Sequence, residues 1–344
     1  MKVSELGEFG LINVLNEVVQ TSNQGTDNSS PLGFELKVGI GDDTAVWHSS
    51  GTHGLYTTDT VVEGVHFTRA TTPWRDLGWK LMAANVSDIA SMGGLCLYAL
   101  VTLGLPPDTD VDDLRALYQG MADLGNRYGV KVAGGDIVRS PVAFATVALT
   151  GAAERPPMLR SKALPGYQVA VTGYVGSSAA GLEVLLSGTP ANSEAVELLV
   201  SAHRRPEPCI KEGRILLMHG VAAAMDVSDG LADDLSKLCT ASGVSATIEA
   251  GDVPMHPALQ EVFPERCLDM ALGGGEDYKL VFAADENLMA EVIPLLSPSA
   301  AVIGRITAGD QGRVRVVDSR SGTQEELTPR GWDHFKSPST TEAN

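Results

Sequence analysis

The stretch VGIGDDTAVWHSSGTHGLYTTDTVVEGVHF, residues 38–67, carries more charged and hydroxyl side chains than an ordinary fold needs. Two short apolar runs within it, Ala45–Trp47 and Gly54–Tyr56, predict the strands of a β-hairpin. Asp42-Asp43 precedes the first strand and Thr57-Thr58-Asp59 follows the second, so both acidic clusters are expected at one end of the pair. Converging carboxylates repel one another unless a cation lies between them, and oxygen ligands of this kind suit magnesium or calcium. The alternative is that Gly-Asp-Asp forms a simple turn and the threonines only favour a strand.

Length and composition limit the class of protein. A chain of 344 residues with 44% hydrophobic content is long enough for two domains with separate cores. The formal net charge of −18 argues against nonspecific nucleic-acid binding and against docking on an anionic membrane, because both depend on basic surface. We therefore expect no nucleic-acid partner and no membrane partner.

The cysteines and the apolar runs indicate a cytoplasmic protein. Four cysteines are scattered without a Cys-x-x-Cys pair, which fits reduced core thiols better than disulfides or a zinc site. The N-terminus carries acidic residues and lacks a long apolar stretch, and the chain nowhere has the run of about 20 apolar residues that a membrane span needs. The expected location is the cytoplasm.

A second acidic position lies on a predicted helix. Residues Asp76–Met92 have helical length and composition, and Asn85 and Asp88 fall at the margin of the apolar surface of this helix. A carboxylate at such a margin is either a ligand or a residue that only bonds backbone or a neighbouring side chain. Further strands are expected at Leu97–Leu105, Val130–Ala133 and Ala143–Thr150, with an amphipathic helix over Asp110–Tyr128.

Glycines and a basic loop mark the end of the first half. Gly134-Gly135-Asp136 follows the strand Val130–Ala133, where backbone amides and a carboxylate can approach one ligand, although a simple turn explains these residues nearly as well. The composition shifts to Pro, Gly and basic residues around Gly151–Gly166, which we interpret as the boundary between domains 1–153 and 154–344. Arg160 in this loop is either a phosphate contact or one partner of a surface ion pair.

The second half contains two more acidic clusters. In AAAMDVSDGLADDLS, residues 222–236, an apolar strand brings Asp226, Ser228 and Asp229 to the start of a helix. One such residue could serve only as an N-cap, but three oxygen-bearing side chains within four positions again suit a hard cation. In LGGGEDYKLVF, residues 272–282, Glu276 follows three glycines and precedes a strand, so a ligand site lined by backbone is plausible there.

The joint pattern is more specific than any of its members. Acidic residues recur at glycine-flanked strand ends or helix starts, and the common phosphate-loop, dinucleotide, protein-kinase and zinc-protease motifs do not occur. An acidic protein approaches a polyanion through cations. The residues therefore suggest several magnesium ions that hold a polyphosphate.

Nine segments in chain order resemble the thiamine-monophosphate kinase family, which belongs to the aminoimidazole ribonucleotide synthetase-like superfamily. These segments cover nearly the whole chain, and they are EFGLI, GIGDDTAV, TTDTVVEGVHF, NVSDIASMG, GGD, RSKALPG, DVSDGLADDL, GGGEDY and GWDHF. The resemblance implies an α/β (α+β) fold of two domains. In such a fold the N-terminal mixed sheets of a homodimer form a shared barrel, and an α/β C-terminal domain lies beside each of them.

The resemblance also implies roles for individual residues. The implied ATP contacts are Tyr118, Gly135, Asp136, Arg160 and Ser228, and the implied thiamine monophosphate contacts are His66, Glu276 and Trp332. The implied magnesium set is Asp43, Thr57, Thr58, Asp59, Asp88, Asp136, Asp226 and Asp229. Asp59, Asp136 and Arg160 would act directly in catalysis. Without the resemblance, His66 reads as a polar residue at a strand end and Trp332 as a packing aromatic.

The implied chemistry is direct in-line transfer of the ATP γ-phosphoryl group to thiamine monophosphate, the final step of thiamine diphosphate formation. Three alternatives remain open: an aminoimidazole ribonucleotide synthetase, a noncatalytic magnesium- and ATP-binding protein, and a metal-dependent phosphohydrolase. Two departures from the family pattern stand out. Ile137-Val138 follows GGD where hydroxyl residues are frequent in the family, and Thr21–Pro31 reads as an enlarged loop.

Overall fold

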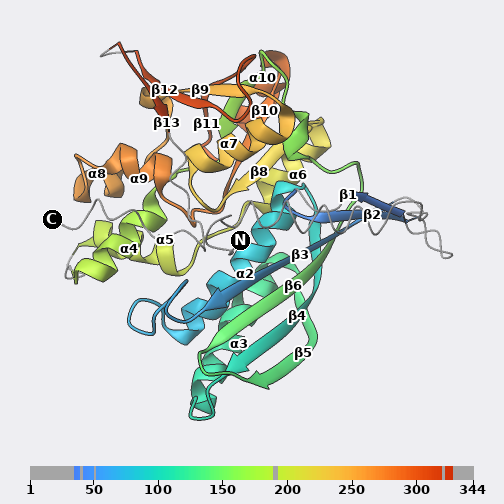
Figure 1. Ribbon diagram of the computed structural model, residues 1–344, viewed down its shortest axis with the longest axis vertical. Coiled ribbons are helices and arrows are strands. Elements are labelled where there is room, and N and C mark those ends of the chain that lie inside the picture. The colour runs from blue at the N-terminus through green and yellow to red at the C-terminus, as the bar shows by residue number, and fades with distance from the viewer. Residues whose placement is uncertain (1–34, 39–41, 50–51, 189–192, 320–321, 328–344) are drawn as a thin grey trace, which may run out of the picture.

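The computed structural model describes residues 35–38, 42–49, 52–188, 193–319 and 322–327 of the chain. Figure 1 shows two mixed sheets, one from the first half of the chain and one from the second, with helices between and around them. The predicted loop Thr21–Pro31 and Trp332 lie outside the described residues. No described helix is long and apolar enough to cross a membrane.

Within the described residues, the first sheet has six strands in the order β1-β2-β3-β6-β4-β5. Only the β4–β5 pair within it is parallel, and the other neighbours are antiparallel. Its strands are β1 (Glu35–Val38), β2 (Ala45–Ser49), β3 (Thr52–Val62), β4 (Leu95–Leu105), β5 (Lys131–Arg139) and β6 (Phe144–Ala153).

Two helices, α2 (Trp74–Ser91) and α3 (Val111–Tyr128), lie against one face of this sheet (Figure 1). They cross so closely that a Cβ atom added at Gly78 of α2 would lie 1.9 Å from the carbonyl oxygen of Leu117. Glycine is therefore required at this crossing. We call the other face of the sheet the outer face. It exposes large apolar side chains, namely Tyr56, Leu95, Leu97, Tyr98 and Leu100.

The second sheet has seven strands in the order β13-β12-β9-β11-β7-β10-β8, in which β12 and β9 are parallel. Alternate residues of β7, β8 and β10 enter different cores, as Val169 and Ala170 do on β7. This part of the sheet is therefore buried on both faces, which explains its continuous apolar sequence. The strands are β7 (Gln168–Val171), β8 (Ala223–Val227), β9 (Ser245–Glu249), β10 (Lys279–Ala284), β11 (Ala301–Thr307), β12 (Val314–Asp318) and β13 (Thr323–Leu327).

Helix α2 joins the two halves. It packs against α3, β3 and β6 of the first half and against β8 and β10 of the second. Its residues are buried almost all round from Leu77 to Ser91, and these include the polar side chains of Lys80 and Asn85. One hydrophobic core therefore contains Leu81 and Val86 of α2 together with Leu280 and Phe282 of β10.

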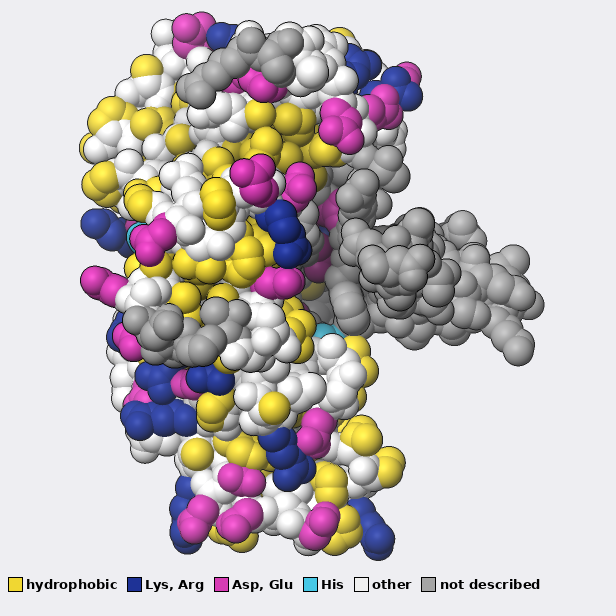
Figure 2. Space-filling model, turned by 90° about the vertical axis from the view of Figure 1, so that its left-hand side faces the viewer, with side chains coloured by type: hydrophobic (Ala, Val, Ile, Leu, Met, Phe, Trp, Pro, Cys, Tyr) yellow, Lys and Arg dark blue, Asp and Glu magenta, His cyan; other side chains and the backbone are white. Residues whose placement is uncertain are grey.

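The remaining helices in the described part of the chain belong to the second half. Helix α7 covers the face of the second sheet opposite α2, and α4, α5 and α8 share a smaller core. On the face drawn in Figure 2, the described basic side chains are interspersed with acidic ones. The helices are α4 (Ser177–Ser187), α5 (Glu194–Arg204), α6 (Ile210–His219), α7 (Leu231–Ser242), α8 (Pro257–Val262), α9 (Cys267–Gly273) and α10 (Glu286–Val292), with 3-10 turns η1 (Arg160–Lys162), η2 (Ala250–Asp252) and η3 (Ile293–Leu295).

Several expectations from the sequence are confirmed. The hairpin forms, with Ala45 opposite Tyr56, and the helix expected over Asp76–Met92 is α2. Two expectations about strand ends are wrong. Gly134-Gly135-Asp136 does not end a strand but lies within β5, because β5 continues to pair with β4 as far as Arg139. Asp59 likewise lies inside β3, which extends to Val62 through its pairing with β6.

Candidate active site

Three carboxylates from separate parts of the chain converge. Asp43 precedes β2, Asp88 is on α2, and Asp226 is on β8. Each offers one oxygen, and these oxygens all lie within 4.8 Å of one another. We call Asp43, Asp88 and Asp226 the carboxylate cluster. It joins the first half of the chain to the second, since Asp226 comes from the second sheet.

Hydroxyl groups of α2 and β3 orient the carboxylate cluster. The Ser91 hydroxyl donates to Oδ2 of Asp43 over 2.7 Å, and the Ser87 hydroxyl donates to Oδ2 of Asp226 over 2.8 Å. The Thr57 hydroxyl donates to Asp88. Ser87 precedes Asp88 in the sequence and Ser91 follows it. Because the two serines are four residues apart, they lie on the same face of the helix.

The cluster holds more negative charge than its surroundings balance. Burial and the neighbouring carboxylates Asp59, Asp226 and Asp43 raise the pKa of Asp88 well above its usual value. Burial raises the pKa of Asp59 to about 6, with further contributions from the charges of Asp229 and Asp43. Buried oxygen ligands with excess negative charge fit a hard divalent cation, so the residues present suit Mg²⁺.

Arg160 partly offsets this charge. It lies in the segment between the two halves, and its Nε donates to Oδ1 of Asp43 over 3.0 Å. Its backbone amide donates to Oδ2 of Asp42 over 3.2 Å. An arginine beside a cluster of metal-ligand type is placed where it could meet the phosphate groups of a bound nucleotide.

Asp234 of α7 accepts hydrogen bonds from the loop that follows β8. Its Oδ2 accepts from the backbone amides of Ser228, Asp229 and Gly230 at 2.9, 2.9 and 3.1 Å. Lys237 bonds both Asp229 and Asp234. These bonds fix the conformation of the segment that carries Ser228 and Asp229 beside the carboxylate cluster.

Glu276 lies on a segment that contacts this loop. Its backbone has a positive φ of 64°, and its amide donates to the carbonyl of Ser228 over 2.7 Å. Its carboxylate bonds Lys80 of α2. The buried Tyr278 phenol lies within electrostatic reach of Glu276 and of Asp59, Asp226 and Asp88, whose charges add to burial in raising its pKa. The Glu276 segment therefore borders the carboxylate cluster.

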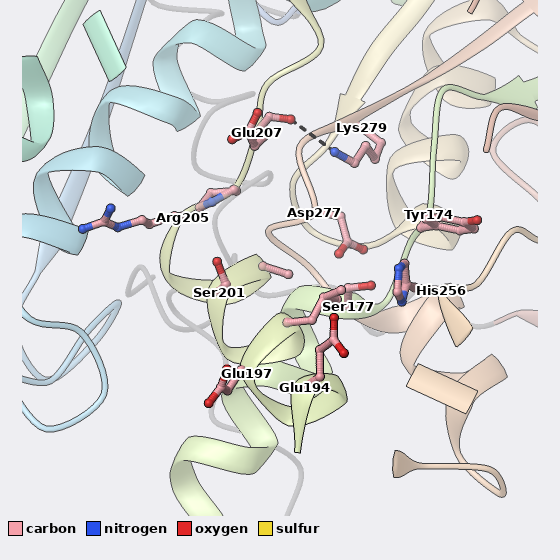
Figure 3. Close-up of a pocket in the computed structure, with 13 residues that line it drawn as sticks. Tyr174, Ser177, Glu194, Glu197, Ser201, Arg205, Glu207, His256, Asp277 and Lys279 are labelled. Atoms are coloured by element: carbon pink, nitrogen blue, oxygen red, sulfur yellow. Dashed lines mark hydrogen bonds between the residues drawn. The ribbon is translucent and has the colours of Figure 1, made fainter. Parts of the chain in front are cut away.

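A cavity of about 560 Å³ lies on the other side of this segment, between α5 and the pair formed by Tyr174 and His256 (Figure 3). Asp277 lines it and accepts from the amides of Gly176 and Ser178 at the start of α4. Burial raises the pKa of Asp277 to about 6. Among the described residues, none of the site residues expected from the sequence lines this cavity.

Thr58 and Asp136 lie apart from the carboxylate cluster. Residues alternate along β3, so Thr57 and Asp59 face α2 whereas Thr58 is exposed on the outer face and donates to the carbonyl of Val147. Asp136 pairs with Thr102 of β4, in the same cross-strand row as Thr146 and Thr60 on the outer face.

Gly135 is on the edge strand β5, and Tyr118 is on helix α3. A Cβ atom at Gly135 would lie 1.9 Å from the carbonyl oxygen of Val101, so glycine is required for β5 to pair closely with β4. Tyr118 is on α3 and is 37% exposed. His66 lies in the turn after β3, where its Nδ1 accepts from the amide of Val62 over 3.0 Å.

Sequence reasoning missed Lys80, Ser87, Ser91 and Asp234. Three of these left a signal: Ser87 and Ser91 flank Asp88 in NVSDIAS at helical spacing, and Asp234 follows the DVSDG segment. Lys80 left a weaker signal, because it is the only basic residue of α2 after Arg75. Its partner Glu276 is 196 residues away, so the sequence alone does not pair them.

These observations define a class: a two-domain α/β protein whose halves are joined by a central helix and share a buried cluster of cation-binding type. The first half, residues 41–153, matches the family described as AIR synthase related protein, N-terminal domain. Residues 165–317 match the C-terminal domain of the same family.

Comparison with individual proteins narrows the class. The chain is 37% identical over 310 residues to thiamine-monophosphate kinase from Bacillus subtilis, covering 88% of this chain and 94% of the relative. It is 35% identical over 339 residues to the enzyme of that name from Escherichia coli K12, covering 96% and 99%. The solved structure of AaThiL complexed with AMPPCP and TMP has a TM-score of 0.84 and 33% identity, covering 97% and 99%. The chain therefore belongs to the thiamine-monophosphate kinase family.

Proposed function

We propose that this protein transfers the γ-phosphoryl group of ATP to the phosphate of thiamine monophosphate and releases thiamine diphosphate and ADP. The observation that carries the proposal is the convergence of Asp43, Asp88 and Asp226 from both halves of a chain in this family. A buried, carboxylate-rich site of this kind fits a reaction in which two polyanions must be brought together.

Mg²⁺ is part of the proposal. The residues that would hold it are Asp43, Thr57, Thr58, Asp59, Asp88, Asp136, Asp226 and Asp229. When bound, magnesium offsets the charge of the phosphate oxygens and aligns them for transfer.

The protein's own residues bind and orient the two substrates. Arg160 and Ser228 would contact ATP, with Tyr118, Gly135 and Asp136 completing its site, and Arg160 would stabilise charge that develops on the transferred group. The acceptor phosphate is already ionised at neutral pH, so no general base is required. We therefore propose direct in-line transfer without a phosphoenzyme.

The acceptor site would consist of His66, Glu276 and Trp332. Glu276 supports this assignment by its position, since its segment bonds the Ser228 loop and its carboxylate is about one third exposed. A carboxylate there suits thiamine monophosphate, whose thiazolium ring is cationic and whose pyrimidine ring carries an amino group.

A homodimer completes the proposal. Thr58 and Asp136 lie on strands β3 and β5, which are separated by β6 and β4, so three strand spacings put them about 14 Å apart within one chain. One metal site cannot include both side chains of the same chain across that distance. If two outer faces pack into a shared barrel, Asp136 of one copy can approach Thr58 of the other. The exposed apolar side chains of the outer face, including Tyr98 and Leu100, support such packing.

The remaining parts of the proposal concern organisation and location. We propose that residues 1–153 form the ATP, magnesium and dimerisation domain and that residues 154–344 complete the active site. A cytoplasmic location is consistent with ATP as the phosphoryl donor.

The test is an omission experiment with purified protein, ATP, Mg²⁺ and thiamine monophosphate. The proposal predicts thiamine diphosphate and ADP in equal amounts only when all three additions are present. Inorganic phosphate without thiamine diphosphate would indicate a phosphohydrolase. ATP binding without turnover would indicate a noncatalytic protein, and turnover only with formylglycinamidine ribotide would indicate a ring-closing synthetase.

A further inference from the structure

Lys80 is a buried cation that the proposed reaction does not yet use. It lies on α2, its side chain is 5% exposed, and its Nζ is 2.6 Å from Oε2 of Glu276. The ring nitrogens of His203 on α5 lie 3.3 and 3.4 Å from the same Nζ. The contact joins the first half of the chain to the second, because α2 and Glu276 belong to different halves.

Burying the ammonium group of Lys80 costs free energy unless a partner compensates its charge. Burial lowers the pKa of Lys80, and the charge of Glu276 acts in the opposite direction and favours the protonated form. His203 is in turn held by the Ser178 hydroxyl, 3.2 Å from its Nδ1. Filling space on α2 would need only an apolar side chain, so the ammonium is explained by its partner, Glu276.

The two sides of Glu276 differ. Oε2 faces the buried Lys80 and lies 3.6 Å from Nδ1 of His203, whereas the side chain as a whole is 34% exposed. Among the described residues, Oε1 has no hydrogen-bond partner. The backbone of Glu276 is also fixed, by its positive φ and by its bond to the carbonyl of Ser228. One oxygen is therefore anchored inside while the other is available to a ligand.

We propose that Lys80 is a positioning residue that holds the carboxylate of Glu276 in the orientation that binds the acceptor substrate. This inference rests on the proposed function. The acceptor class is a cationic heteroaromatic ring system with an amino group, whose N–H donates to Oε1 or whose positive charge faces it. Without Lys80, Oε2 of Glu276 loses the ammonium group that orients the carboxylate on its buried side.

The first variant is Lys80→Met, which keeps the length of the side chain and removes its charge, and Lys80→Gln is the second, which keeps a donor without the charge. Lys211→Met, at an exposed lysine of α6, is the matched control. Lys80→Met is expected to raise the KM for thiamine monophosphate at least about tenfold, while kcat and the KM for ATP stay within about twofold. Lys80→Gln should raise the KM for thiamine monophosphate less, and Lys211→Met should change neither KM.

A purely structural role for Lys80 would give a different result. It would lower the melting temperature and change both KM values and kcat together, or leave the KM for thiamine monophosphate unchanged in a folded variant. Either result overturns the inference. If Lys80→Met does not fold, the KM values of Lys80→Gln decide by the same criterion.

A double-mutant cycle tests whether Lys80 acts through Glu276. Glu276→Gln should raise the KM for thiamine monophosphate in the unsubstituted protein but by less than about threefold in the Lys80→Met background. Equal effects in both backgrounds would overturn the inference. If the unsubstituted protein forms no thiamine diphosphate, the proposed function fails and this inference fails with it. If product forms but the cycle shows no coupling, only the inference fails.

Discussion

Arg160 and Asp43 form an ion pair across the two halves of the molecule, with Nε of Arg160 3.0 Å from Oδ1 of Asp43. The side chain of Asp43 has no exposed surface, and that of Arg160 is 21% exposed. The arginine is therefore the basic group that compensates Asp43 when no cation is bound. Because phosphate oxygens would also attract Arg160, this pair links the charge state of the carboxylate cluster to substrate binding.

Arg160→Ala should destabilise the metal-free protein more than the magnesium-loaded protein. Removing one partner of a buried pair leaves Asp43 uncompensated, which costs on the order of 3 kcal/mol, and a bound cation would restore part of the balance. Urea unfolding with and without Mg²⁺ measures the difference, with Arg155→Ala as the exposed control. Equal losses of stability in both conditions would contradict the assignment of Asp43 to a cation site.

Asp226→Asn should stabilise the metal-free protein and abolish most activity. The amide keeps an oxygen that can accept from Ser87, and it removes one of the mutually repelling charges. The melting temperature of the metal-free variant should rise, the further rise caused by Mg²⁺ should shrink, and kcat should fall at least about 100-fold. Asp269→Asn, at an exposed position of α9, should match the unsubstituted protein. A variant that loses stability without magnesium would argue against mutual repulsion in the cluster.

His203 should make stability depend on pH. Burial, together with the charge of Lys80, lowers its pKa to about 4 from the model-compound value of 6.5, while Glu276 acts in the opposite direction and Arg204 adds to the lowering. Between these pH values the unfolded chain binds a proton that the folded protein excludes, so this contribution to stability decreases as the pH falls from 6.5 to 4.

His203→Gln should therefore be less sensitive to pH than the unsubstituted protein in that window. The comparison is made on the difference between the two proteins in urea unfolding, because other groups titrate in the same range and cancel in the difference. A difference in unfolding free energy that is constant from pH 4 to 6.5 would show that His203 titrates normally.

A shared active site predicts recovery of activity from two inactive proteins. Asp136→Asn and Asp226→Asn should each be nearly inactive. In a mixed dimer in which Asp136 acts across the interface, one site carries both substitutions and the other carries neither. Random exchange of subunits should then restore about a quarter of the unsubstituted activity. No recovery after exchange that is verified by differently tagged subunits would mean that Asp136 acts within its own chain or is not part of the site.

Much of the local structure could be predicted from the sequence, and the long-range contacts could not. The hairpin and α2 follow from apolar periodicity and turn residues, which are local properties. The extent of β5 through Gly134-Gly135-Asp136 could not be predicted, since it depends on pairing with β4. The face of the sheet on which Thr58 lies also depends on strand boundaries and register.

The same limit applies to the candidate site. The acidic clusters were visible as local sequence patterns. The roles of Lys80 and Arg160 depend on their partners Glu276 and Asp43, which are 196 and 117 residues away in the sequence. A charged residue on an apolar helix such as α2 can be flagged from sequence, but its partner is set by the packing of the two halves. The sequence therefore predicts the candidate ligands, whereas the residues that position them are found only from the three-dimensional structure.

The most direct test of the central claim is a single-turnover reaction with ATP labelled in its γ-phosphoryl group, excess protein, Mg²⁺ and thiamine monophosphate. Direct transfer predicts that the label passes from ATP to the terminal phosphate of thiamine diphosphate at one rate, with no labelled protein and no lag. Label that accumulates on the protein before product, or that appears as inorganic phosphate in place of thiamine diphosphate, would contradict the account.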